Sequence, residues 1–326
     1  MTCTNRIWRL ISLWVWKETT AWTEAGTYTW IPLTISPFIK PVNEYLKNEQ
    51  WVWRIEWSIS QELIKSESET NLEGWVWQNT FWHILTAWFW QSTAPALVET
   101  WVYKHSFTVL NSNNHKSYSL VTDWATQNLS LYNLLDTLSI TAEVWMVVNF
   151  SALFKGKKVN TTTGETVSFT SEDYFKVANM TIKFADDVDW LDVASTVDLQ
   201  TVNFEIAKNV TSIYKVWSLE PNCMHNQQFE LTGDFEAMFT DDTYKDYVTW
   251  WTNKAMRITI TWDSLIWATE KAELSFDFAN LAFTDWDRTT DNNAIITQTT
   301  WFEWSYAVWD WEMITAYLQN TISSTY

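Results

Sequence analysis

Apolar and polar residues alternate along most of this chain, so that every second side chain would lie on the same face of an extended strand. Helical periodicity is confined mainly to Thr80–Phe89 and Asp241–Val248. Short alternating runs separated by polar turns predict a mainly β fold, as a sandwich or a barrel. The clearest alternating runs are 212–216, 228–239, 256–262, 272–283, 302–308 and 313–321.

The polar interval Phe154–Thr170 separates two halves of the chain. It contains Gly156 and Gly164 and lacks apolar periodicity, which is typical of a linker. The predicted division is an N-terminal arm over 1–30, a first β domain over 31–155, a linker over 156–170 and a second β domain over 171–326.

The two halves also have a similar order of patterns. In the first half, an alternating run over 54–64 is followed by a helical run over 80–88, and in the second half a run over 228–239 is followed by one over 241–248. This order predicts an internal duplication, with two similar β lobes that each carry a short flanking helix.

Tryptophan and glycine are present in inverted proportions. The chain has 27 Trp and 5 Gly, whereas average usage of about 7% would supply roughly 23 Gly. Trp250, Trp251, Trp309 and Trp311 lie between alternating runs, in turn positions that favour glycine. This pattern favours UGA codons that mean glycine but were translated as Trp. The alternative is a Trp-rich carbohydrate- or membrane-binding surface, which predicts Trp at alternating strand positions.

The charge balance and the cysteine count exclude several classes of protein. The formal net charge of -18 disfavours binding to nucleic acid or to an anionic membrane. Cys3 and Cys223 are too few for a disulfide framework or a thiolate metal cluster. The apolar run near the N-terminus is short and contains Arg9, so neither a signal peptide nor a membrane span is expected.

No catalytic, cofactor-binding or metal-binding residue is predicted. The four histidines, at 83, 105, 115 and 225, lack metal-ligand spacing, and His83 and His105 are expected to pack within the fold. The segment Asp285–Asn292 resembles a calcium loop, but Ile296 occupies the position of the bidentate Glu, so an acidic loop between strands is expected. None of the catalytic or nucleotide-binding motifs that we considered occurs, even when Trp is replaced by Gly.

When Trp is replaced by Gly, the order of elements resembles the tail tube proteins of long-tailed bacteriophages. An early strand over 53–64 precedes a Leu-rich helix ending in glycine over 81–90, and Tyr103, His105 and Phe107 form a Y-x-H-x-F strand. The resemblance covers Arg6 to Tyr326. In the second half it rests on the segments 228–248, 256–266 and 297–321.

The resemblance implies a virion structural protein of the phage tail, made in the cytoplasm of a bacterial host and lacking enzymatic activity, cofactors and membrane partners. Its implied partners are other tail proteins and further copies of itself, in rings that stack into a tube through which DNA passes without specific binding. Six tube domains per ring would come from a trimer of duplicated chains, or from a hexamer. A long hairpin or the arm Met1–Trp30 would reach a neighbouring ring. The alternatives are a Trp-rich carbohydrate-binding β-sandwich and an enzyme acting on glycosides.

Overall fold

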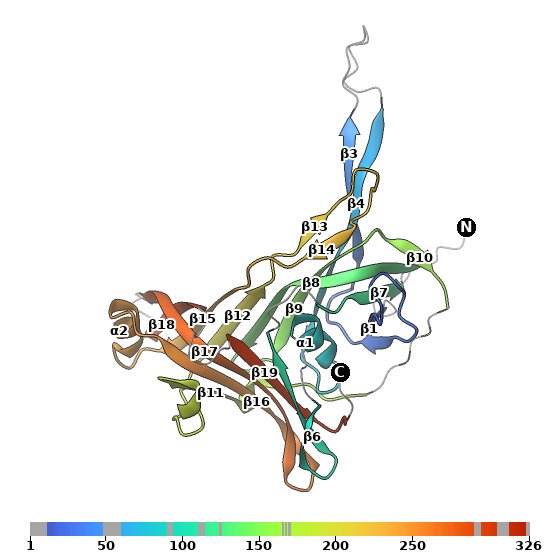
Figure 1. The fold of residues 1–326 in the computed structure, drawn as a ribbon. Coiled ribbons are helices and arrows are strands. Elements are labelled where there is room, and N and C mark those ends of the chain that lie inside the picture. The colour runs from blue at the N-terminus through green and yellow to red at the C-terminus, as the bar shows by residue number, and fades with distance from the viewer. Residues whose placement is uncertain are drawn as a thin grey trace, which may run out of the picture.

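The fold is mainly β, as the alternating pattern predicts, and its strands form a large antiparallel sheet system (Figure 1). The computed structural model describes residues 12–47, 60–89, 94–109, 115–123, 126–164, 166, 168, 171–289, 295–304 and 313–323.

Two α-helices lie at or near the expected positions. α1 spans Trp82–Trp88 and α2 spans Thr243–Thr249. The strands of the first half are β1 (Ser12–Lys17), β2 (Thr29–Ile31), β3 (Ile39–Lys47), β4 (Gln61–Trp75), β5 (Ala96–Glu99), β6 (Val102–Thr108), β7 (Tyr118–Asp123), β8 (Gln127–Glu143), β9 (Asn149–Gly156) and β10 (Asn160–Thr162). Those of the second half are β11 (Met180–Ala185), β12 (Thr201–Ala207), β13 (Thr211–Ile213), β14 (Cys223–His225), β15 (Glu230–Met238), β16 (Lys254–Trp267), β17 (Glu270–Arg288), β18 (Thr297–Trp304) and β19 (Ile314–Asn320).

The two long strands β8 and β17 organise the sheets. One half of β8 pairs with β7 and β10, and its other half pairs with β9 and β12. β17 pairs with β16, and its successive segments pair with β19 and β18. The neighbours of each long strand therefore change along its length.

The same order of strands occurs in both halves. In the first half the hydrogen-bonded order is β3–β4–β9–β8–β7, and in the second half it is β12–β15–β18–β17–β16. In each half the helix follows the second strand of this order, since α1 comes after β4 and α2 comes after β15. The repeated order is compatible with two similar lobes.

The core consists of aliphatic and aromatic side chains from both halves, in one continuous cluster. Phe204 of β12 packs edge-on against Phe276 and Phe278 of β17, with ring centroids 5.3 Å and 5.4 Å apart. Tyr247 of α2 stacks on Phe283 at 5.3 Å, and so fixes this helix on the sheet. Each fully buried aromatic side chain contributes about 1.5–3 kcal/mol from apolar burial.

Several boundaries differ from those expected from the sequence. The described part of the arm over 1–30 begins with β1, which does not project, because it pairs with β7 along its whole length and Leu13 and Val15 are buried in the core. The linker over 156–170 contains β10, which pairs with β8. The strand expected over 212–216 ends at Ile213, where the β13–β14 turn begins.

Candidate assembly surfaces

The joint between the two halves is a regular strand pairing. β12 lies antiparallel to β8 over seven residues, from Thr201 opposite Glu143 to Ala207 opposite Thr137. Phe204 faces Ile140 at the centre of this pairing, and both side chains are buried. One sheet, from β4 through β9, β8, β12, β15 and β18 to β17, therefore crosses from one half of the chain to the other.

The face of this sheet that points away from the core is polar and acidic. Its residues align in three rows across the strands, because the registers place mostly polar residues opposite one another; Trp75, Trp301 and Ala282 are the apolar members. The first row is Glu73, Ser151, Ser139, Glu205, Thr232, Glu303 and Ala282. The second is Trp75, Asn149, Thr141, Asn203, Asp234, Trp301 and Asp285, and the third is Glu143, Thr201, Glu236, Thr299 and Asp287.

These three rows contain eight carboxylates and no Lys or Arg. Hydroxyl and amide side chains separate most of the carboxylates. A surface of this kind is well hydrated, and its field repels phosphate groups. We name this surface the acidic face.

Two strand edges of the same sheet have no strand beside them within the described part of the chain. β3 pairs with β4 on one side only, and the segment Ala282–Arg288 of β17 pairs with β18 on one side only. In the repeated strand order, β8 takes the place of β17. Its segment Thr137–Glu143 is not an edge, because β12 pairs with it. Unpaired N–H and C=O groups along an edge are a template for another strand.

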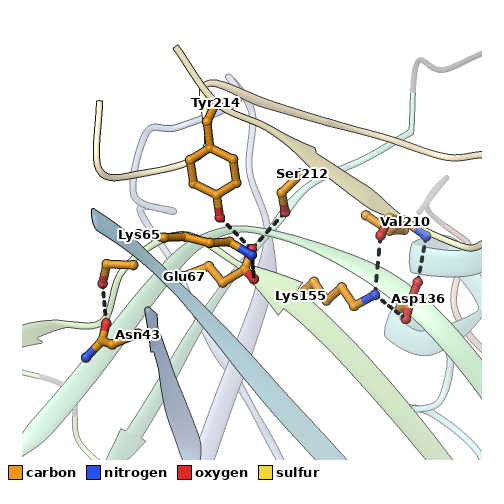
Figure 2. Close-up of polar contacts among 9 residues, drawn as sticks. Asn43, Lys65, Glu67, Asp136, Lys155, Val210, Ser212 and Tyr214 are labelled. Atoms are coloured by element: carbon orange, nitrogen blue, oxygen red, sulfur yellow. Dashed lines mark hydrogen bonds and ion pairs between the residues drawn. The ribbon is translucent and has the colours of Figure 1, made fainter. Parts of the chain in front are cut away.

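The hairpin formed by β3 and β4 projects from the body of the molecule, and the small hairpin formed by β13 and β14 lies beside it (Figure 1). The Glu67 carboxylate of β4 accepts hydrogen bonds from the Ser212 hydroxyl at 2.9 Å and the Tyr214 hydroxyl at 2.8 Å (Figure 2). Lys65 forms an ion pair with Glu67 at 2.8 Å. Burial alone would raise the pKa of Glu67, but these hydrogen bonds hold it below its ordinary value.

A second set of contacts fixes the base of the small hairpin. Asp136 of β8 accepts a hydrogen bond from the backbone N–H of Val210 at 2.6 Å and pairs with Lys155 of β9 at 2.8 Å (Figure 2). The Lys155 ammonium also donates to the Val210 carbonyl at 3.3 Å. The second half of the chain is therefore attached to the first half along the projecting hairpin as well as through β12.

The histidines considered in the sequence do not converge on a site. His83 lies in α1, stacked on Trp82, and burial together with Lys17 lowers its pKa to about 3. His105 of β6 hydrogen-bonds to the Ile322 carbonyl at 2.9 Å and lies beside Phe107, in agreement with a packing role. Across the described ranges, no group of His, Cys, Asp and Glu side chains has an arrangement that could hold a metal ion.

The acidic loop expected between strands is, in its first part, a strand. Asp285–Arg288 continue β17 and pair with β18, because alternation of exposed and packed side chains persists through Trp286. Residues 290–292 of that segment lie outside the described residues.

Lys208 is a buried residue that the sequence pattern did not single out. Its ammonium donates to the Ala87 carbonyl at 2.8 Å, near the end of α1, and lies 4.7 Å from the centre of the Trp88 ring. Complete burial holds its pKa well below the ordinary value. Since the side chain supplies a donor to a helix end, it stabilises the attachment of α1 to the second half.

A protein-family model described as "Phage tail tube protein" matches residues 91–300, which is more than half of the chain. The chain belongs to the phage tail tube proteins. This membership gives it a structural role in the virion tail, associated with other tail components. No curated protein matches the chain. In the described residues, no helix combines the length and apolarity that crossing a bilayer requires.

Proposed function

We propose that copies of this chain polymerise into stacked rings that form a tail tube for DNA passage. The observation that supports this most directly is the single sheet that crosses both halves, which has one acidic face and two edges that no strand of the described residues covers. A closed ring would pair these edges and remove the hazard of uncontrolled association that open edges create.

The acidic face is proposed to line the channel. Non-specific binding to DNA depends on Lys and Arg groups that neutralise phosphates. Apart from Trp75, Trp301 and Ala282, the three rows offer carboxylates, hydroxyls and amides and no cation, so DNA would pass along this face without adhering to it.

The ring is proposed to contain three chains, with pseudo-sixfold symmetry. The support is the strand order that occurs twice in the chain, which is compatible with two similar tube domains per copy. The alternative is a hexamer with one tube domain per chain. Sedimentation velocity of isolated rings separates these two masses by a factor of about two.

The projecting hairpin is proposed to contact the next ring of the stack. The turn of the adjacent small hairpin exposes three apolar side chains, Val216, Trp217 and Leu219. Exposed clusters of apolar side chains of this kind are typical of protein–protein contacts.

The test is assembly of the purified chain. Negative-stain microscopy at increasing protein concentration is expected to reveal hollow tubes built from stacked rings. A protein that stays monomeric at high concentration, with neither rings nor tubes, would contradict the proposal.

We also propose that many of the Trp residues are translated from UGA codons that mean glycine. Six non-glycine residues in the described part of the chain have positive φ, and four of these are Trp: Trp22, Trp101, Trp145 and Trp251. The left-handed region strains a bulky side chain and favours glycine. Trp309 and Trp311, two of the sharpest cases in the sequence, lie outside the described residues.

The encoding DNA tests this proposal. UGA at the positions of Trp22, Trp101, Trp145 and Trp251 supports recoding, and UGG at these positions contradicts it. Other Trp side chains, such as Trp14 and Trp88, are buried and packed.

A carbohydrate-binding surface would place exposed Trp on alternating strand positions, whereas Trp145 and Trp251 lie in turns. These two positions do not favour a sugar-binding function.

A further inference from the structure

A charged hollow lies on the side of the molecule that faces away from the acidic face. The strands β11, β16, β17, β19 and β6 pair in this order (Figure 1). Phe204 of β12 packs across the core against Phe276 of β17. Successive side chains of a strand point to opposite faces. Glu205 of the acidic face and Asp277 of the hollow therefore point in opposite directions from the core.

Three cations from three strands line this hollow, which has a volume of about 420 Å³. They are Lys104 of β6, Lys183 of β11 and Arg257 of β16. The buried Asp277 carboxylate holds the Arg257 guanidinium through two bonds, from Nε at 2.6 Å and from Nη2 at 2.8 Å. The Lys104 ammonium lies 4.6 Å from the centre of the Tyr317 ring. The hollow thus gathers fixed positive groups, whereas the rows of the acidic face contain none.

One exposed carboxylate already occupies the place where these cations converge. It belongs to Asp192, in the segment 186–200 that joins β11 to β12, which we name the strap. The Asp192 carboxylate accepts a hydrogen bond from Nη1 of Arg257, and the Lys183 ammonium donates to the Asp192 carbonyl at 3.0 Å. Arg257, and more weakly Lys183 and Lys104, hold the pKa of Asp192 below its ordinary value.

The strap does not depend on this carboxylate for its attachment. The Leu191 side chain is fully buried, and the Val197 N–H donates to the Ile182 carbonyl of β11 at 2.8 Å. The Asp192 side chain, in contrast, is 80% exposed. Ion pairs at such exposed positions contribute little to stability. The Asp192 carboxylate can therefore leave Arg257 while the strap stays in place.

We propose that the hollow binds a carboxylate side chain of another protein of the tail, and that Asp192 fills the site in the free chain and is displaced on binding. Arg257 would bind the incoming carboxylate with the planar geometry that suits this group. Once Asp192 has left, three cations face the carboxylates of Asp277 and Glu273, so the lining keeps an excess of one positive charge.

Two observations favour a protein as the source of the carboxylate. The family associates the chain with other tail components. Val193, next to Asp192 on the strap, is 76% exposed and offers apolar contact that a free anion would not use. In the proposed ring the acidic face lines the channel, so the hollow would open on the outside of the tube. This placement rests on the proposed function, whereas the carboxylate site does not.

Peptide binding tests the site. A fluorescent peptide of glutamate residues is titrated with the full chain, and its anisotropy is compared with that of the corresponding glutamine peptide. The salt concentration is about 0.1 M, at which charges more than about 10 Å apart are largely screened. Only the glutamate peptide is expected to bind. Asp192→Asn should tighten binding by a factor of about two to five, the range that one exposed ion pair supplies.

Matched variants separate the hollow from the overall charge. Asp198→Asn removes an exposed carboxylate of the same strap outside the hollow and should leave the affinity unchanged. Lys104→Gln with Lys183→Gln should weaken binding. Lys40→Gln with Lys158→Gln removes the same charge at exposed positions elsewhere and should not.

Each contrary result has a definite meaning. Equal affinities for Asp192→Asn and Asp198→Asn, or for the two lysine pairs, would overturn the site. Competition by free glutamate as strong as that of the peptide, at equal carboxylate concentration, would overturn the protein partner. Binding by the dispersed chain that is lost in tubes would overturn the outer placement. A chain that binds the peptide but forms no tubes would contradict the proposed function and support the carboxylate site.

Discussion

Single residues decide how closely the strands of this protein can approach. A Cβ added at Gly233 would meet the Phe302 ring and the Asn203 carbonyl, the latter at 2.5 Å. Both neighbours belong to strands that are fixed by pairing on either side of β15. The glycine is therefore required by close approach, since its φ is not positive.

We predict that Gly233→Ala destabilises the chain by about 1–3 kcal/mol, because neither the packed ring nor the backbone carbonyl can move freely. Gly26→Ala is the matched control. A Cβ at Gly26 would meet nothing within 4 Å, so this substitution should be close to neutral. Urea unfolding of the two variants and the parent measures the difference, and equal midpoints for both variants would refute the packing argument.

Tryptophan at positive φ gives a second prediction at this scale. Trp145 has φ 71° and is 95% exposed, so its side chain contributes little packing while its backbone is strained. Trp145→Gly should raise stability by about 1 kcal/mol, since the left-handed conformation costs a non-glycine residue roughly 1–2 kcal/mol.

Trp88→Gly is the control for that substitution. Trp88 is the last residue of α1, is buried, and packs against Phe229 with ring centroids 5.8 Å apart. Its loss should cost about 3–5 kcal/mol, or more once the helix propensity of glycine is included. Thermal unfolding gives both values, and a lower Tm for Trp145→Gly would contradict the strain argument.

At the scale of elements, polar contacts attach the β13–β14 hairpin to the projecting hairpin. Glu67 accepts hydrogen bonds from Ser212 and Tyr214 and pairs with Lys65. Its pKa lies below the ordinary value of 4.5. A depressed pKa stabilises the folded state above the ordinary value, and this stabilisation is lost as the pH falls through the folded value.

We therefore predict that the β13–β14 hairpin loosens in acid before the body of the protein unfolds. At neutral pH, Glu67→Gln should produce part of the same effect, because the amide cannot form the ion pair with Lys65. Limited proteolysis near Lys215, within the β13–β14 turn, measures the loosening. Glu62→Gln is the control, since Glu62 is an exposed residue of the same strand. Equal cleavage rates for both variants would contradict the proposed attachment.

At the scale of the whole molecule, the acidic face is expected to keep DNA from adhering. Glu205 and Glu303 lie in one row on strands of the second half, separated by Thr232. Replacing both by Lys changes the charge of the face by four units and creates phosphate-binding groups in the channel.

The doubly substituted protein should retain double-stranded DNA at 50 mM salt and release it by about 200 mM, where electrostatic binding weakens steeply. Filter binding measures the retention. Glu62→Lys with Glu24→Lys changes the charge equally at exposed positions outside the three rows and is the control. Equal retention by both variants would show that net charge, not the face, governs DNA binding.

The sequence by itself determined the fold class, the two helices and the family. Apolar and polar residues alternate wherever one face of a strand is buried and the other is exposed. Runs such as 272–283 therefore predicted strands, and this one lies within β17. The local turn pattern also marked Trp251 as a position that favours glycine, and its φ is 54°.

Only the tertiary structure decided which strands are neighbours. The pairing of β12 with β8 joins residues far apart in the chain, and alternation carries no information about which edge a strand will meet. The same limit explains why 12–17 was expected in an arm, and why the acidic face was invisible in the sequence. Its rows depend on the register between seven strands, whereas the charges along the chain fix only the total charge.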